Sequence, residues 1–71
     1  MKVIFDSETD TLSIILRDEK IVESDEVKDN VIFDYNKENK IVSIEILDAS
    51  KLVSEPQGIF YELKGKDKVL T

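Results

Sequence analysis

A regular alternation of apolar and polar residues is the feature that most restricts the fold of this chain. Residues 11–17 and residues 41–47 each place Leu, Ile or Val at every second position, and most of the residues between them are polar. A period of two puts alternate side chains on opposite faces of a β-strand, whereas a helix has a period of about 3.6. Both segments are therefore predicted to be half-buried strands.

Each of these strands follows a polar loop that joins it to an earlier apolar segment. Residues 6–10 follow the β-branched and aromatic segment 2–5, and residues 36–40 follow the similar segment 31–35. A strand, a short polar loop and a second strand are typical of a β-hairpin. The sequence therefore predicts two hairpins, and Asn39 is expected to adopt the left-handed conformation that Asn tolerates in such loops.

Two acidic residues of the second hairpin are predicted to lie apart. If its loop closes a regular hairpin, Tyr35 pairs with Lys40 and Asp34 lies opposite Ile41. Glu45 then lies well beyond Asp34 on the neighbouring strand. We therefore expect each carboxylate to lie on a solvated strand face or beside a lysine, as acids usually do.

The remaining segments are less regular. Residues 18–20 are predicted to form a turn, residues 21–23 are a candidate for a very short strand, and residues 24–30 are predicted to form a charged loop. Residues 48–53 lose the period of two. Asp48 is a suitable N-cap, so a short helix is expected there. Residues 59–63 return to strand character, and the lysine-rich segment 64–68 is expected to be solvated.

The predicted fold class is α+β and mainly β. It consists of an antiparallel four-stranded meander of two hairpins, followed by a short helix and a C-terminal strand or arm. A length of 71 residues is enough for one domain. Residues 1–71 are therefore expected to form a single small domain.

A chain this small has few ways to stabilise itself. It contains neither cysteine nor histidine, which excludes disulfides, thiolate metal sites and the commonest metal ligand. One short helix covers little of a sheet, so apolar side chains remain on the second face. We therefore predict a homodimer in which a second copy buries this surface, with residues 59–63 as a candidate for exchange or for the interface.

The negative charge is concentrated in the first half of the chain. Residues 1–34 contain ten acids and four bases, whereas residues 35–71 contain six of each, and the net charge is -6. This distribution argues against a nucleic-acid partner, because phosphates would be repelled. It suits a basic protein partner or simply solubility. The candidate partner-binding residues are Asp18, Glu19, Glu23, Asp25, Glu26 and Asp29.

The sequence gives no indication of a membrane segment. No apolar run approaches the roughly 20 residues needed to span a bilayer, and Asp6 follows Met1 too closely for the apolar region of a signal peptide. No membrane partner is therefore expected, and the predicted location is the cytoplasm.

Several motifs of the chain resemble one family. These motifs are Phe5-Asp6-Ser7-Glu8-Thr9-Asp10-Thr11-Leu12, Val31-Ile32-Phe33-Asp34-Tyr35 and Ile44-Glu45-Ile46-Leu47-Asp48-Ala49-Ser50. Together they resemble the small bacterial and archaeal family called domain of unknown function 2283, over about residues 3–53. The chain departs from the family pattern at Ser13, Asn39 and Ser43, and residues 55–71 form an extension. The resemblance implies a small β-rich protein with a short helix and, for some members, an antitoxin-like role.

The acidic loop is the candidate for cation binding. Asp6, Glu8 and Asp10 alternate along it, and converging carboxylates could hold Ca²⁺ or Mg²⁺. The alternative is that Asp6 and Asp10 accept hydrogen bonds from backbone amides and fix the turn. The loop lacks the glycine and the distal glutamate of an EF-hand.

Catalytic machinery is not evident in the sequence. With no His or Cys, no group of the usual kind activates a Ser, Thr, Tyr or Lys nucleophile. Gly58 and Gly65 are isolated, so no phosphate-binding loop is present. We therefore predict no catalytic residue and no cofactor.

Three functional hypotheses follow from these observations. The leading one is a non-enzymatic protein-interaction module, an antitoxin-like partner of a basic protein. The second is a small cation-binding or hydrolytic protein that uses Asp6, Glu8 and Asp10. The third is a structural accessory of unknown role.

Overall fold

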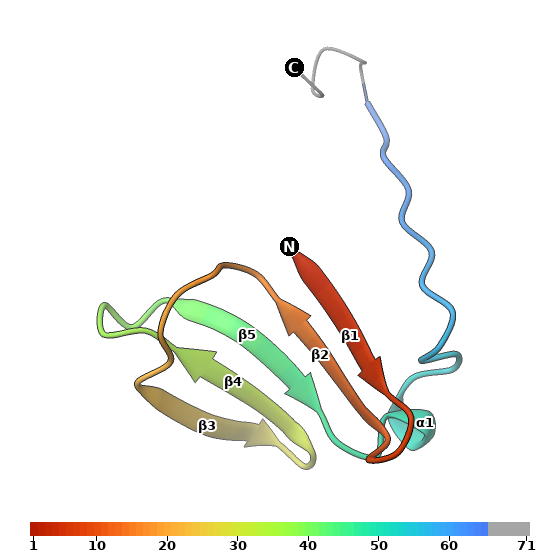
Figure 1. The fold of residues 1–71 in the computed structure, drawn as a ribbon, viewed down its shortest axis with the longest axis horizontal. Coiled ribbons are helices and arrows are strands. Elements are labelled where there is room, and N and C mark those ends of the chain that lie inside the picture. The colour runs from red at the N-terminus through yellow and green to blue at the C-terminus, as the bar shows by residue number, and fades with distance from the viewer. Residues whose placement is uncertain (66–71) are drawn as a thin grey trace.

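The fold is a single antiparallel β-sheet with one short helix at its end (Figure 1). The computed structural model describes residues 1–65. The sheet contains five strands in the order β1-β2-β5-β4-β3. The elements are β1 (Lys2–Asp6), β2 (Thr11–Ile15), β3 (Glu23–Lys28), β4 (Val31–Tyr35), β5 (Ile41–Ile46) and α1 (Ala49–Leu52).

The two predicted hairpins are present. β1 pairs with β2, and β4 pairs with β5. Asn39 has a φ of 65°, so its left-handed conformation in the second loop is confirmed. The prediction of a simple meander is wrong, because β2 lies beside β5 and the chain then crosses to the far edge of the sheet.

β3 is the strand that the sequence did not predict. Residues 24–30 were expected to form a charged loop, and residues 21–23 were only a candidate for a very short strand, but Glu23–Lys28 pairs with β4 at the edge of the sheet. All six residues of β3 are exposed. An edge strand with two solvated faces needs no apolar alternation, so the pattern that marks β2 and β5 is missing here.

The short helix is confirmed, but its predicted cap is wrong. Asp48 has a φ of 50° and makes no side-chain hydrogen bond to the helix. Asp10 caps it from the first hairpin loop instead. Its main-chain carbonyl accepts a hydrogen bond from the Ala49 amide, and its carboxylate accepts bonds from the Ser50 amide and hydroxyl. The helix is thus tied to the β1–β2 loop.

The segment after α1 is an arm and not a strand. Residues 59–65 are exposed and belong to no strand or helix. In Figure 1 the arm leaves α1 beside the end of β1 and diverges from the sheet. The predicted C-terminal strand is therefore absent from the described chain, whereas the alternative of an arm is correct for residues 59–65. Most of the lysine-rich segment 64–68 lies outside the described residues.

The strand register assigns the side chains of β1, β2, β5 and β4 to two faces, because directly opposite residues of antiparallel strands point to the same side. We call one the apolar face: it carries Val3, Phe5, Leu12, Ile14, Val31, Phe33, Ile44 and Ile46. We call the other the mixed face: it carries Ile4, Ser13, Ile15, Ile32, Asp34, Ser43 and Glu45. Neither face is covered by a second layer within the described chain (Figure 1).

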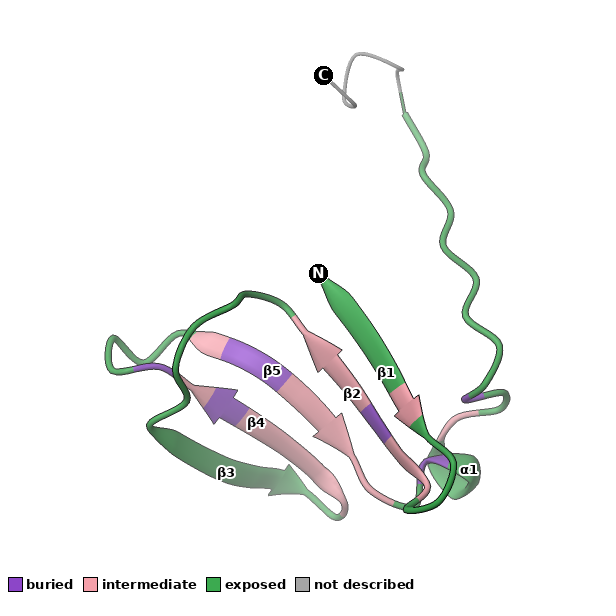
Figure 2. Ribbon diagram, in the orientation of Figure 1, coloured by how far each residue is buried: buried purple, intermediate pink, exposed green. Residues whose placement is uncertain are grey.

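Few side chains are fully buried. Among the described residues, the buried apolar ones are Leu12, Val42, Ala49 and Pro56, and Figure 2 shows buried positions scattered across the sheet. Small domains bury a small share of their surface and are marginally stable. The monomer therefore depends strongly on each buried apolar contact.

Leu12→Ala should test this dependence. Leu12 is 4% exposed, and truncation of a buried leucine costs about 2–5 kcal/mol. We expect urea denaturation to show a loss of that size in the free energy of unfolding. The control is Ile59→Ala in the exposed arm, which should change stability by less than about 0.5 kcal/mol. Equal losses in the two variants would contradict the assigned core.

Candidate functional site

A buried carboxylate lies on the mixed face of the sheet. Asp34 of β4 is 1% exposed and is the largest fully buried side chain among the described residues. One carboxylate oxygen accepts a hydrogen bond from the Ser24 hydroxyl and the other from the Ser43 hydroxyl, each at 2.6 Å. Because Ser24 is on β3 and Ser43 is on β5, Asp34 links three adjacent strands.

Glu45 completes this cluster. A bulge between Asp34 and Tyr35 shifts the register, so Asp34 pairs with Ser43 and not with Ile41. Glu45 then lies diagonally beside Asp34 on the same face, and the two carboxyl groups share a hydrogen bond. The prediction that these carboxylates lie apart is therefore wrong, since it assumed a regular hairpin.

The two carboxyl groups differ in acidity. The hydrogen bond with Asp34, burial and the negative charge of Asp34 together raise the pKa of Glu45 from 4.5 to about 7. Burial opposes ionisation of Asp34, but hydrogen bonds from Glu45, Ser24 and Ser43 outweigh it and lower the pKa of Asp34 below 3.8. Below about pH 7 Glu45 therefore mostly holds a proton, which it donates to the Asp34 carboxylate.

The chemistry open to this cluster is the binding of a proton. Both oxygens of Asp34 already accept hydrogen bonds from serines, and the side chain is shielded from solvent. Glu45 is only partly buried, so solvent reaches its carboxyl group more readily than it reaches the buried carboxylate of Asp34. Below we call Asp34, Glu45, Ser24 and Ser43 the carboxyl cluster.

The acidic loop between β1 and β2 is stabilised by its own carboxylates. The Asp6 carboxylate accepts hydrogen bonds from the amides of Glu8 and Thr9, at 3.0 and 3.4 Å. The Asp10 carboxylate is turned toward Ser50 at the start of α1. Asp6 thus fixes the turn, as in the alternative proposed from the sequence, whereas Asp10 holds the helix instead of the turn.

No group of carboxylates within residues 1–65 resembles a metal centre. Among residues 1–65, no three Asp or Glu side chains come together in an arrangement that could hold a metal ion. The carboxyl cluster offers two carboxyl groups, and Asp34 already uses both of its oxygens on serine hydroxyls.

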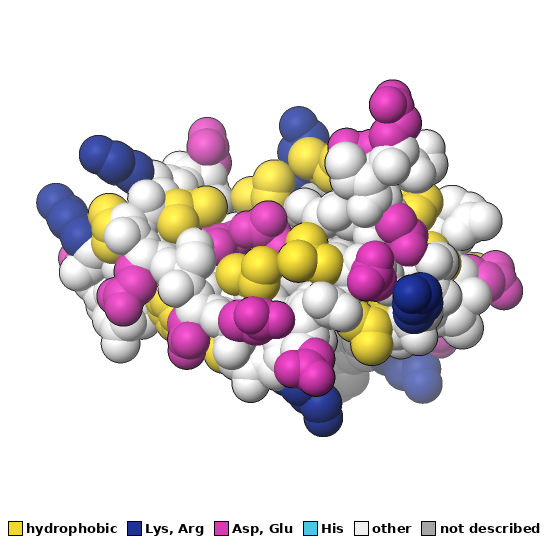
Figure 3. All heavy atoms as spheres, turned by 90° about the horizontal axis from the view of Figure 1, so that it is seen from below, with side chains coloured by type: hydrophobic (Ala, Val, Ile, Leu, Met, Phe, Trp, Pro, Cys, Tyr) yellow, Lys and Arg dark blue, Asp and Glu magenta, His cyan; other side chains and the backbone are white. Residues whose placement is uncertain are grey.

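The six candidate partner-binding acids lie on β3 and in the two connections that flank it in the sequence. Glu23, Asp25 and Glu26 are on β3. Asp18 and Glu19 lie in the β2–β3 connection, and Asp29 lies in the β3–β4 turn. Figure 3 looks toward the β3 edge of the sheet and shows acidic side chains spread over it, with hydrophobic side chains between them.

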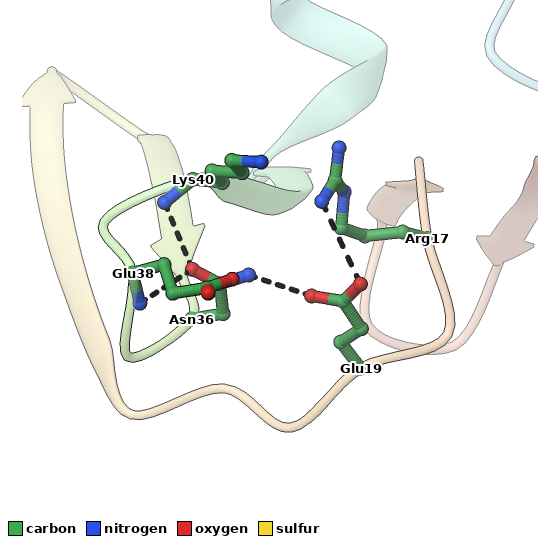
Figure 4. A network of polar contacts seen from close by, with 5 residues as sticks. All are labelled: Arg17, Glu19, Asn36, Glu38 and Lys40. Carbon is green, nitrogen blue, oxygen red and sulfur yellow. Dashed lines mark hydrogen bonds and ion pairs between the residues drawn. The ribbon is translucent and has the colours of Figure 1, made fainter.

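Two of these acids also support the fold. A Glu26 oxygen accepts a hydrogen bond from the Asn30 amide in the β3–β4 turn. Glu19 accepts one from the Asn36 side chain at 2.6 Å and pairs with Arg17 (Figure 4). The side chains of the other four acids are exposed and make no hydrogen bond or ion pair that the structure shows among residues 1–65.

Asn36 organises the turn that faces the β2–β3 connection. Its side-chain oxygen accepts hydrogen bonds from the amides of Glu38 and Lys40, each at 2.9 Å, while its amide group donates to Glu19 (Figure 4). Asn36 is buried. The network holds the β2–β3 connection against the β4–β5 turn and therefore positions the start of β3.

With this geometry described, the comparisons with known proteins identify the family. The family described as "Protein of unknown function (DUF2283)" matches residues 2–50. The chain belongs to this family. The DUF2283 match covers all five strands and the start of α1 and ends before the arm. No curated protein and no solved structure matched the chain.

No described helix is long and apolar enough to cross a membrane.

Sequence reasoning missed the serines and the asparagine of these networks. Ser24 was assigned to a loop, and Ser43 was taken only as a polar position of a strand. One signal was available for Ser43: it shares its face with Glu45 two residues away. Asn36 directly follows a strand, where a side chain that bonds to the backbone two residues on is common.

The carboxyl cluster should make stability depend on pH near neutrality. The pKa of Glu45 is raised, so its contribution is fully present below about pH 4.5 and is lost as the pH rises to about 7. The lowered pKa of Asp34 acts in the other direction and matters only below about pH 4. We expect the free energy of unfolding to fall by about 2 kcal/mol between pH 4.5 and 8, allowing for solvent screening at Glu45.

Glu45→Gln should remove most of this pH dependence. The amide keeps the shape of the protonated acid and can donate to Asp34 at every pH, so the variant should be more stable than the parent chain at pH 8. Urea denaturation at pH 5 and pH 8 measures both effects. Glu38→Gln, at an exposed glutamate in the β4–β5 turn, is the control and should keep the parental pH dependence. If Glu45→Gln also kept it, the shared proton would be ruled out.

Proposed function

We propose that this chain is a non-enzymatic protein-interaction module that binds a basic, extended segment of another protein along β3. The observation that carries the proposal is the position of the acids: Glu23, Asp25 and Glu26 lie on an exposed edge strand. A soluble protein can carry acids anywhere on its surface. Here they are concentrated where a backbone is also available for pairing.

The charge of this region supports a basic partner. Residues 18–29 contain six acids and two bases, so most of the net charge of -6 lies in this stretch. Complementary charge increases the rate of association and excludes wrong partners. A basic segment would be attracted to β3, whereas another acidic strand would be repelled.

The backbone of β3 supports binding by strand addition. β3 pairs with β4 on one side only, so its other side offers N–H and C=O groups to an added strand. Acids on an edge strand also prevent edge-to-edge aggregation. Both roles agree, since the same charges that repel copies of this chain select a basic strand.

The burial of Asp34 supports a structural role for this carboxylate instead of a catalytic one. Asp34 is buried and fully engaged with side chains of its own sheet. A catalytic acid or base needs to reach a proton of the substrate. The antitoxin-like role implied by the resemblance is the specific case in which the basic partner is a toxin.

A second part of the proposal is a homodimer formed through the apolar face. This face carries eight apolar side chains on four strands, and no second layer covers it within residues 1–65. Two sheets that pack face to face would bury these side chains in a common core. The small number of buried apolar residues in the monomer supports a second copy as the occupant.

Peptide binding can test the role of β3. The probe is a short peptide of alternating lysine and valine, added to isotopically labelled protein. We expect amide shifts in β3 that weaken as salt is raised. The triple variant Glu23→Gln, Asp25→Asn, Asp29→Asn should bind several-fold more weakly because it loses the local charge.

The matched control is the triple variant Glu8→Gln, Glu55→Gln, Glu62→Gln. It has the same net charge as the β3 variant, but its three neutralised acids are exposed positions away from β3. The control should bind as the parent chain does. Equal weakening in both variants, or shifts confined to β1, would reject β3 as the binding edge.

Sedimentation can test the homodimer. We expect a mass twice that of the 8.2 kDa chain. Phe33→Gln on the apolar face should weaken the dimer roughly tenfold or more, as expected for an aromatic at an interface centre. Ile32→Gln, the neighbouring residue on the mixed face, should weaken it far less. A monomeric mass at all concentrations would reject the dimer.

A further inference from the structure

The arm that follows α1 contains an exposed apolar segment. Residues 59–63 read Ile-Phe-Tyr-Glu-Leu, and the exposed fractions are 59% for Ile59, 93% for Phe60 and 75% for Tyr61. None of these five residues makes a hydrogen bond that the structure shows. Their β-branched and aromatic character is typical of a strand. The segment therefore has strand-forming residues without a strand to pair with.

β1 has one edge that is free to pair with an added strand. It lies at the opposite edge of the sheet from β3 and pairs only with β2. It has five residues, as has the segment 59–63. Its apolar side chains are also exposed, with Val3 at 37% and Ile4 at 41%. An added strand would complete its hydrogen bonds and cover both of these side chains.

We propose that residues 59–63 of one copy pair as an added β-strand with β1 of a second copy, in a reciprocal exchange. This inference rests on the homodimer of the proposed function and names the segment that joins the two copies. The exchange adds a sixth strand to each sheet and closes the β1 edge.

Charge selects β1 over β3 as the acceptor edge. The segment 59–63 carries one acid, Glu62, and no base. β3 carries three acids and one base, whereas β1 carries Lys2 and Asp6 and is neutral. Pairing with β3 would bring like charges together, and pairing with β1 would not.

An added strand would place apolar side chains on both faces of the sheet. Ile59, Tyr61 and Leu63 would lie on one side of the strand, and Phe60 and Glu62 on the other. When the centres of β1 and the segment meet, Tyr61 lies opposite Ile4, so the three-residue side extends the mixed face and covers Ile4. Phe60 then extends the apolar face beside Val3 or Phe5, according to the strand direction.

The path of the arm favours a second copy over the arm's own sheet. In Figure 1 the arm leaves α1 near the Asp6 end of β1 and moves away from that strand along its length. Pro56 is buried, and the turn that precedes Gly58 is closed by a hydrogen bond between the Gly58 amide and the Glu55 carbonyl. This turn fixes the direction in which the arm starts and carries it outward.

Cysteine cross-linking tests the exchange, because the chain has no cysteine of its own. Ile4 is the centre of β1 and Tyr61 is the centre of the segment, so the two positions meet in either strand direction. Neighbouring strands place Cα atoms about 4.5–5.5 Å apart, which a disulfide can bridge. We expect a mixture of Ile4→Cys and Tyr61→Cys chains to form a disulfide-linked pair containing one of each.

The control replaces the β1 position with one at the far end of the sheet. Lys37→Cys lies in the β4–β5 turn and, when mixed with Tyr61→Cys, should link at least about tenfold more slowly. A double variant with Ile4→Cys and Tyr61→Cys in one chain should give linked dimers on oxidation. A monomer closed by an internal disulfide would overturn the proposal, since the arm would then pair with its own β1.

The outcomes separate this inference from the homodimer itself. A dimeric mass without a link between positions 4 and 61 would overturn the exchange and leave the dimer through the apolar face intact. A monomeric mass without that link would overturn both. A dimeric mass with the link between different chains is the result expected from the exchange.

Discussion

Burial of the Asp34 carboxylate is the constraint around which this sheet is organised. A charged group shielded from water is tolerated only when its oxygens are hydrogen-bonded. Ser24 on β3, Ser43 on β5 and the proton of Glu45 meet that need. The pairing of β4 with both neighbours therefore has to keep its register, because a shift by one residue would carry these partners to the opposite face.

The same cluster explains why the two faces of the sheet differ. The central positions of the mixed face carry polar groups that hydrogen-bond to each other. Serines and carboxyl groups therefore separate the aliphatic residues of this face. The other face is continuous and aliphatic or aromatic over four strands. The polar groups of the mixed face are hydrogen-bonded within the sheet, whereas the apolar face has no covering layer within residues 1–65. Such a sheet fits a protein that completes its core by association.

Sequence reasoning predicted the elements that follow a simple period and missed those set by a partner strand. β2 and β5 alternate clearly, and both hairpins and the short helix were found. β3 has no apolar alternation because both of its sides are solvated. The bulge beside Asp34 depends on how two strands meet, so the Asp34–Glu45 pair could not be predicted from a regular hairpin. Asp10 replaced Asp48 as the cap because it approaches α1 from a distant loop.

The crossing of the chain between β2 and β3 has a consequence for how the protein folds. β1 and β2 form one local unit, and β3, β4 and β5 form a second, since each is built from neighbouring segments. Within residues 1–65, the β2–β5 seam joins the two units, together with the tie between Asp10 and α1. Local contacts form faster than distant ones. The two units are thus expected to form first and separately, and the β2–β5 seam to form last.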